Sequence, residues 1–318
     1  MNTLSIPPRT NSPRIGLALS CGGARGLAHV GVIQVLEENG IHVDVISGAS
    51  MGAYVGCLWA AGYDGQDLQR FAAEIASPKD LWHRLDLVIP PVKGLFLGNG
   101  IRSRLAEALR GATFETLVKE LHVVAADIET LERRVFSTGD VAKAVHASFA
   151  IPGICVPVEI DGHRYVDGGV VDPLPVGILA GLGCAHIIAV SVIPSMREVS
   201  MGLGEPEPIH PPGMIHRCLS ALNRSCNVFA KGNVVDTLRR SLTAAEVRMA
   251  HTSARRASIV IRPAVQSTAW HDYHRYPNYI ELGRRAAEAN LPALLALLST
   301  PPMKGERHET TLNALACS

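Results

Sequence analysis

The sequence of 318 residues lacks a charge imbalance, because 30 Lys and Arg stand against 29 Asp and Glu and the formal net charge is +1. Binding to nucleic acid through its phosphates needs a broad basic surface, so we expect no nucleic-acid partner. The seven cysteines are scattered and form no C-x-x-C pair and no Cys/His cluster at zinc-ligand spacing. We therefore expect no disulfide framework, no structural metal and no other cofactor.

Long hydrophobic runs are also missing. The N-terminal stretch MNTLSIPPRTNSPR contains no apolar segment of the kind that a secretory signal requires, which predicts a cytoplasmic protein. The longest apolar stretch, residues 43–62, is interrupted by Asp44, by serines and by glycines, whereas a membrane span needs about 20 mostly apolar residues. With 47% hydrophobic residues the chain is expected to bury a large core, as one large domain or two small ones.

Strands and helices alternate in the first part of the chain. Residues 15–19 (IGLAL) are wholly apolar, as in a buried strand, and the apolar face of residues 27–38 predicts a helix that ends near Gly40. A second buried strand is predicted at 43–46 and an Ala-rich helix at 51–61. Such β-α-β units build a parallel sheet whose active groups lie beyond the carboxyl ends of the strands.

The alternation continues to the end of the chain. Further helices are expected at 67–75, 101–109, 175–182 and 279–298, and further strands at 121–128, 134–137, 186–192 and 258–261. Asp161-Gly162 predicts a tight hairpin between strands at 156–160 and 163–166. Residues 217–256 are expected to be mostly helical and carry eight basic residues against Asp236 and Glu246, a local charge of +6.

We divide the chain by composition and pattern. The expected units are a flexible tail at 1–13, a core at 14–194, a Pro/Gly-rich linker with a basic helical insertion at 195–257, a final strand and closing helix of the same domain at 258–298, and a flexible tail at 299–318.

Residues 48–52 (GASMG) match G-x-S-x-G, in which a serine occupies a sharp strand-to-helix turn that exposes its hydroxyl. Gly48 and Gly52 would prevent clashes in that turn. The motif begins where a predicted strand ends and leads into a predicted helix, which is the context that this chemistry needs. Ser50 is therefore the candidate nucleophile, and a tight turn with an idle serine is the alternative.

A serine nucleophile also needs hydrogen-bond donors for the negative charge that develops on the substrate oxygen. The glycine-rich loop at 20–26 (SCGGARG) could supply backbone N–H groups, and a helix begins close by. A phosphate-binding or dinucleotide loop is the alternative. A G-x-G-x-x-G register that ends at Gly26 would place its first glycine at Cys21, so that fingerprint is broken.

The serine finally needs a base, and none of the 13 histidines stands in a recognisable setting. Asp167 ends a predicted strand and precedes Gly168 and Gly169, which would let its carboxylate approach another loop closely. An aspartate that only forms a turn is the alternative.

Taken together, SCGGARG (20–26), GASMG (48–52) and DGG (167–169) resemble the motifs of the patatin-like phospholipase family, in the family's order. The resemblance is in particular to its bacterial members and to the related catalytic domain of neuropathy target esterase. The stretch between the first two motifs is also similar, as is ASFAIPG at 147–153. The resemblance covers residues 14–194, and it implies a three-layer α/β fold with a mostly parallel central sheet flanked by helices.

The resemblance also implies a mechanism. Ser50 would be the nucleophile and Asp167 the proton acceptor of a Ser-Asp dyad without histidine, cleaving acyl esters of lipids through an acyl-serine intermediate. The implied activity is that of a phospholipase A, a lysophospholipase or a carboxylesterase. The N–H groups of Gly22, Gly23, Ala24 and Arg25 would form the oxyanion hole, with the N–H of Met51 ranked below them.

Two conditions accompany this mechanism. A solvated aspartate has a pKa near 3.9 and is a poor base at neutral pH, so the fold must partly desolvate Asp167 or couple it to Ser50. The family's first loop usually reads D-G-G-G-x-R-G, and Ser20 and Cys21 replace its first two positions, which affects the expected shape of the oxyanion loop or the substrate preference.

Other interpretations stay open. A Ser-His-Asp esterase would need an acid and then a histidine after Ser50, and Asp172 with His271 or His274 fits that order. A non-catalytic lipid-binding or regulatory protein could keep the same fold. The basic segment at 217–256 could hold the protein on an anionic membrane surface, with a solvated helix face as the alternative.

Overall fold

The computed structural model describes residues 13–75, 86, 88, 94–196, 198, 234–265 and 272–299. Its strands are β1 (Ile15–Leu19), β2 (Val45–Ala49), β3 (Glu120–Asp127), β4 (Arg133–Phe136), β5 (Val158–Ile160), β6 (His163–Asp167), β7 (His186–Val190) and β8 (Ile259–Ile261). Its α-helices are α1 (Ala28–Glu38), α2 (Met51–Ala60), α3 (Gly65–Ile75), α5 (Asn99–Leu109), α6 (Val141–Ser148), α7 (Val176–Gly181), α10 (Val234–Ala254) and α11 (Tyr276–Ser299). Short 3-10 helices are η1 (Gly23–Leu27), η2 (Phe114–Thr116), η3 (Gly168–Val170) and η4 (Tyr273–Arg275).

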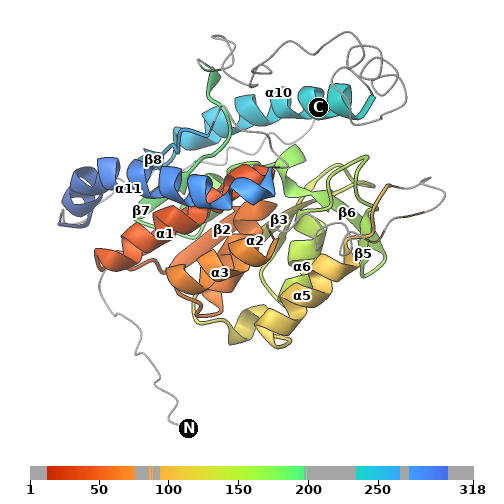
Figure 1. Cartoon of the computed structure of the whole chain (residues 1–318), viewed down its shortest axis with the longest axis horizontal. Coiled ribbons are helices and arrows are strands. Elements are labelled where there is room, and N and C mark those ends of the chain that lie inside the picture. The colour runs from red at the N-terminus through yellow and green to blue at the C-terminus, as the bar shows by residue number, and fades with distance from the viewer. Residues whose placement is uncertain are drawn as a thin grey trace, which may run out of the picture.

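One mixed sheet runs through the middle of the molecule in the order β5-β6-β3-β2-β1-β7-β8, with β4 paired to β3 (Figure 1). Strands β3, β2, β1, β7 and β8 pair in parallel, as β-α-β units predict. Strands β4 and β6 pair with β3 antiparallel, and β5 and β6 form the hairpin expected from Asp161-Gly162. The α/β class is confirmed, and the parallel part of the sheet ends at β3.

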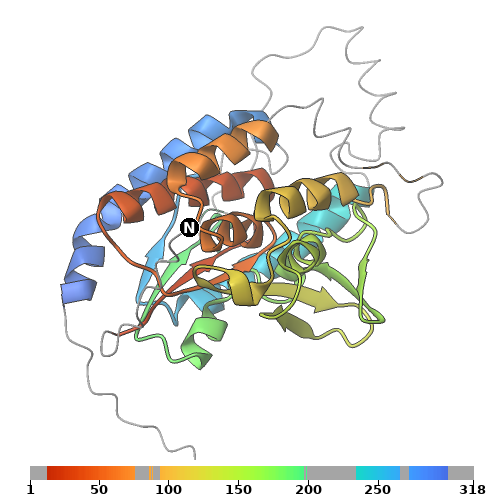
Figure 2. The same cartoon turned by 90° about the horizontal axis from the view of Figure 1, so that it is seen from below.

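Helices cover both faces of the sheet. Helices α1, α3 and α11 lie over one face and the short α7 over the opposite face (Figure 2). Residues of β1 alternate between the two sides: Leu17 and Leu19 belong to the larger core cluster with α1 and α2, while Ala18 belongs to a second cluster with α7 and α10. Every residue of β1 is buried, as expected for a central parallel strand. The three-layer arrangement is thereby confirmed.

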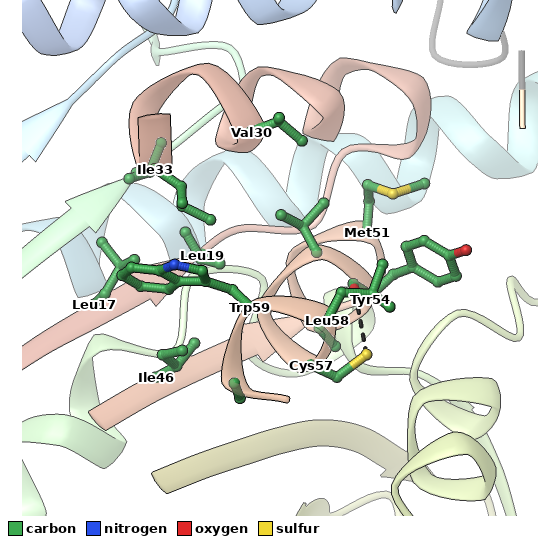
Figure 3. Packing of buried hydrophobic residues seen from close by; sticks show 14 of the residues in the cluster. Leu17, Leu19, Val30, Ile33, Ile46, Met51, Tyr54, Cys57, Leu58 and Trp59 are labelled. Atoms are coloured by element: carbon green, nitrogen blue, oxygen red, sulfur yellow. Dashed lines mark hydrogen bonds between the residues drawn. The ribbon is translucent and has the colours of Figure 1, made fainter. Parts of the chain in front are cut away.

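The larger core cluster fixes the helices that flank the site. Leu17 and Leu19 of β1 belong to this cluster, together with Ile33 of α1 and with Leu58 and Trp59 of α2 (Figure 3). On the outer side of α1, Gly31 lies against α11, because a Cβ at Gly31 would be 1.9 Å from the carbonyl oxygen of Ile280. The backbones of α1 and α11 are therefore in direct contact.

Several boundaries differ from the sequence-based expectation. The second strand was predicted at 43–46 but spans 45–49, so it includes the first two residues of the GASMG motif. The first helix is preceded by the 3-10 helix η1, which takes up the second half of the glycine loop. Of the helix expected at 217–256, the structure describes α10, and residues 217–233 lie outside the described part.

Within the described residues, Cys21, Cys57, Cys155 and Cys184 are free thiols. No group of three or more His, Cys, Asp or Glu in this part of the chain could hold a metal ion. A search of the same residues finds no helix with the length and apolar character needed to cross a bilayer.

Candidate active site

The serine of the GASMG motif lies on a sharp turn between a strand and a helix. Strand β2 ends at Ala49 and α2 begins at Met51, and Ser50 between them has φ 53° and ψ −121°. A positive φ is unfavourable for a residue with a side chain and persists only where the surroundings enforce it. The turn therefore has the strained backbone that G-x-S-x-G predicts.

The two glycines of the motif make room for this turn. A Cβ at Gly52 would lie 2.3 Å from the carbonyl oxygen of Leu19, and one at Gly48 would lie 2.7 Å from the backbone nitrogen of Ala53. Both distances are far below van der Waals contact. Strand β1, the turn and the first turn of α2 can pack this closely only because neither position has a side chain.

Ser50 and Asp167 are in direct contact, although they are 117 positions apart. The Ser50 hydroxyl donates a hydrogen bond of 2.6 Å to Oδ2 of Asp167. The other carboxylate oxygen, Oδ1, accepts a hydrogen bond of 2.7 Å from the backbone N–H of Gly169. Ser50 is 5% exposed and Asp167 is 7% exposed. The carboxylate is thus fixed by one oxygen and faces the hydroxyl with the other.

Burial changes the basicity of this carboxylate. It raises the pKa of Asp167 from 3.8 to about 6, and the hydrogen bonds from Ser50 and from the N–H of Gly169 oppose the rise without cancelling it. At neutral pH the group is still mostly ionised, yet it is a stronger base than a solvated aspartate. The fold supplies the desolvation that a Ser-Asp mechanism needs.

A cavity opens beside the Ser50 hydroxyl. Its walls are formed by Cys21, Gly22, Gly23, Arg25, Ser50, Ile151, Pro152, Ile154, Asp167, Val170, Val192, Ile193, Pro194, Leu242, Thr243 and Glu246. Most of these side chains are apolar, and Arg25, Asp167 and Glu246 are the charged ones. The cavity can therefore take an apolar chain with a polar end.

The glycine loop forms one wall of the cavity, close to Ser50. Gly22, Gly23 and Arg25 line it, whereas Ala24 is fully buried in the core and Met51 is not part of the lining. Gly22 also packs against Val192, two residues after the end of β7, since a Cβ at Gly22 would be 2.4 Å from Cγ2 of Val192. The loop thus brings three of its four predicted oxyanion residues to the cavity.

The loop is held in place by Ser20, one of the two residues that depart from the family's usual loop. The Ser20 hydroxyl accepts a hydrogen bond of 3.0 Å from the N–H of Val192 and donates one of 3.0 Å to the carbonyl of Cys21. The N–H of Cys21 donates a hydrogen bond of 2.9 Å to the carbonyl of Pro173. Ser20 therefore ties the loop to the segment after β7, and Cys21 lines the cavity with a thiol whose pKa is raised by burial.

Helix α10 also contributes to the lining of the cavity, through Leu242, Thr243 and Glu246. Sequence reasoning missed these three residues. Their spacing places them on one helix face, but the sequence does not show what that face covers. Leu238, one turn earlier, touches the loop after α6, where a Cβ at Gly153 would be 3.1 Å from its Cδ2.

The described histidines do not complete a catalytic triad with Ser50, and none of them lines the cavity. Asp172, the acid of that alternative, accepts a hydrogen bond of 2.6 Å from Arg133. His274 is exposed, and its Nδ1 lies 2.6 Å from Oδ1 of Asp272. His271 lies outside the described residues. The geometry therefore gives the triad alternative no support from Asp172 or His274.

The chain belongs to the patatin-like phospholipase family, whose model matches residues 17–180. The NTE family protein Rv1063c of Mycobacterium tuberculosis is 38% identical over 185 residues, which are 58% of this chain and 50% of that protein. Lysophospholipase NTE1 of Kluyveromyces lactis is 28% identical over 311 residues, which are 95% of this chain and 20% of that protein. The chain thus spans half or less of the length of these relatives.

Among solved structures, VipD from Legionella pneumophila is similar with a TM-score of 0.46 and 15% identity, covering 88% of this chain and 67% of that chain.

Proposed function

We propose that the protein is a serine hydrolase that cleaves acyl esters of lipids with Ser50 and Asp167 as its catalytic dyad. The observation that carries this proposal is the 2.6 Å hydrogen bond between the two side chains at a strained turn. Ser50 lines a cavity to which the glycine loop and several apolar side chains also contribute.

The reaction has two steps in this proposal. Asp167 accepts the hydroxyl proton while Ser50 Oγ attacks the ester carbonyl, and the backbone N–H groups at Gly22, Gly23 and Arg25 stabilise the oxyanion. The leaving alcohol takes the proton from Asp167, which leaves an acyl group on Ser50. Water then attacks the acyl group with Asp167 again as base, and the acid is released with the serine restored.

A lipid substrate is supported by the apolar lining and by the relatives. Ile151, Ile154, Val192 and Leu242 would contact an acyl chain, and burying each CH₂ contributes about 0.8 kcal/mol. The relative from Kluyveromyces lactis is named a lysophospholipase. Among the substrates that the sequence leaves open, a lysophospholipid or another single-chain ester fits this name best.

We also propose a peripheral contact with anionic membrane through the basic segment at 217–256. Arg240, Arg248, Arg255 and Arg256 are exposed on and just after α10, whose other face lines the cavity. Each cation near an anionic surface is worth about 1 kcal/mol. Cosedimentation with neutral and anionic vesicles at low and high salt tests this contact, and equal recovery from both vesicle types would remove it.

The dyad is tested by hydrolysis of p-nitrophenyl butyrate by Ser50→Ala and Asp167→Asn variants beside the parent. Each variant should lose at least about 1000-fold in kcat, since each removes a group that acts in both steps. Ser241→Ala is the matched control, because Ser241 is exposed on α10 and does not line the cavity. A folded Ser50→Ala or Asp167→Asn protein with parental activity would show that the dyad is wrong.

Covalent labelling by a fluorophosphonate probe separates the hydrolase from a non-catalytic lipid-binding protein with the same fold. The parent and Ser241→Ala should be labelled and Ser50→Ala should not. If the probe does not label the parent protein, the non-catalytic alternative is favoured.

A further inference from the structure

Ser148 holds the backbone of Ser50. It is the last residue of α6 and is fully buried (0% exposed). Its hydroxyl oxygen accepts a hydrogen bond of 2.8 Å from the backbone N–H of Ser50, although the two residues are 98 positions apart. An N–H at the start of a helix has no acceptor within that helix, and a buried one needs an acceptor from elsewhere. Ser148 supplies this acceptor to Ser50, the residue with the strained backbone.

The segment after α6 holds Asp167 in the same way. The backbone N–H of Asp167 donates a hydrogen bond of 2.9 Å to the carbonyl of Ala150, which is also fully buried. The end of α6 is itself closed by a hydrogen bond of 3.1 Å from the N–H of Phe149 to the carbonyl of Val145. One short segment, residues 148–150, therefore fixes the backbone nitrogen atoms of both members of the proposed dyad.

We infer that Ser148 is a positioning residue of the proposed hydrolase, which sets the orientation of the Ser50 turn and so keeps the Ser50 hydroxyl within reach of the Asp167 carboxylate. The inference rests on the proposed function. Ser148 does not line the cavity, so it acts through Ser50 and not on the substrate. Without its oxygen, the buried N–H of Ser50 lacks this partner, and the strained turn can relax away from Asp167.

The test compares Ser148→Ala with Ser47→Ala. Ser47 is also fully buried, lies on β2 three positions before Ser50, and donates a hydrogen bond of 2.9 Å to the carbonyl of Pro175. Both substitutions remove one buried hydroxyl, but only Ser148→Ala removes a contact to Ser50. Initial rates with p-nitrophenyl butyrate across pH 4.5 to 9 give kcat and KM at each pH. They also give the acid limb of the pH–rate profile, which is the pH range in which the rate falls as Asp167 becomes protonated.

Ser148→Ala should lower kcat by about 10- to 100-fold with little change in KM. Its acid limb should move to higher pH by about half a unit or more, because the Ser50 hydrogen bond holds the pKa of Asp167 down and would be lengthened. Ser47→Ala should keep the parental limb. Parental kcat and limb in a folded Ser148→Ala protein, or the same shift in Ser47→Ala, would overturn the inference.

Two further variants cover the case in which Ser148→Ala does not fold. Ser148→Cys keeps the size of the side chain but replaces oxygen by a weak acceptor, so it should shift the limb in the same direction. Ser148→Thr keeps the oxygen and should retain the parental limb. An unshifted limb in Ser148→Cys would overturn the inference. Ser50→Ala and Asp167→Asn test the dyad itself. If these two variants lose activity while Ser148→Cys keeps the parental acid limb, the dyad stands and only the role of Ser148 is wrong.

Discussion

Ser50 and Asp167 lie level with each other on opposite sides of β3. Ala49 pairs with Val124 in the parallel β2–β3 ladder, and Asp167 pairs with Ala125 in the antiparallel β3–β6 ladder. Strand β3 therefore lies between the strands that carry the two residues, and the 2.6 Å hydrogen bond between their side chains joins them across it. The sheet register, and not the chain between them, brings the two residues together.

The raised pKa of Asp167 predicts the pH dependence of the reaction. Asp167 must be ionised to accept a proton, and its pKa is about 6, so kcat/KM should fall about tenfold per unit as pH drops below 6. A solvated aspartate would place this limb near pH 4. A pH–rate profile between 4 and 8 with p-nitrophenyl butyrate measures it, with circular dichroism as a check that the protein stays folded. A limb that stays near pH 4 would contradict the desolvated base.

Gly168 should tolerate no side chain. A Cβ at this position would lie 2.2 Å from the carbonyl oxygen of Val124, so Gly168→Ala must push the loop away from β3 and move the adjacent Asp167. We expect a loss of about 1–3 kcal/mol in the free energy of unfolding and a larger proportional loss in kcat. Thermal melts and initial rates measure the two effects.

The control for this change is Gly181→Ala. Gly181 is the last residue of α7, and a Cβ there would have no atom within 4 Å. This variant should keep its activity and gain up to about 1 kcal/mol, because alanine favours a helix over glycine. Similar losses in Gly168→Ala and Gly181→Ala would show that the close approach to Val124 is not the cause.

Much of the fold and the proposed dyad could be predicted from the sequence, because local signals stand at the points where chemistry and sterics are strict. Gly52 and Gly168 appear in the motifs because backbone from another strand passes within 3 Å of where their side chains would be. The second strand was predicted too short for a related reason. Gly48 and Ala49 have poor strand propensity, yet they pair with Val123 and Val124 of β3, and Gly48 also pairs with Leu19 of β1.

The residues that the sequence did not identify act through tertiary contacts. The hydrogen bond from Ser50 to Ser148 joins positions 98 apart, and only the packing of α6 on the sheet brings them together. Leu242 and Glu246 face the cavity because of where α10 docks. The basic residues of this segment drew attention to it as a surface, while its cavity-lining face gave no local signal.

The desolvation of Asp167 should also appear in the protein's stability. Its pKa in the folded state is about 6 against an ordinary 3.8, so the folded state binds the proton more tightly than the unfolded state. The contribution of this group to stability is present below pH 4 and is lost as pH rises through about 6, by roughly 3 kcal/mol in all. Asp167→Asn has no such titration.

Urea unfolding of the parent and of Asp167→Asn at pH 4 and pH 7.5 measures this loss. The free energy of unfolding of the parent, relative to the variant, should fall by roughly 2.4 kcal/mol between the two values, because at pH 4 the unfolded carboxyl is already more than half ionised. Other titrating groups cancel in the comparison. If the two proteins keep a constant difference, Asp167 is not desolvated in the folded state.

Leu242 should influence which acyl chains are hydrolysed. It lines the cavity from α10, together with Ile151 and Val192. Leu242→Trp adds bulk to that wall, so the ratio of kcat/KM for p-nitrophenyl decanoate to that for the butyrate should fall by about tenfold or more. Ser241→Trp adds the same ring to an exposed neighbour outside the lining and should leave the ratio unchanged. Equal ratios in the parent and Leu242→Trp would mean that the bound acyl chain extends from Ser50 in a direction that does not contact Leu242.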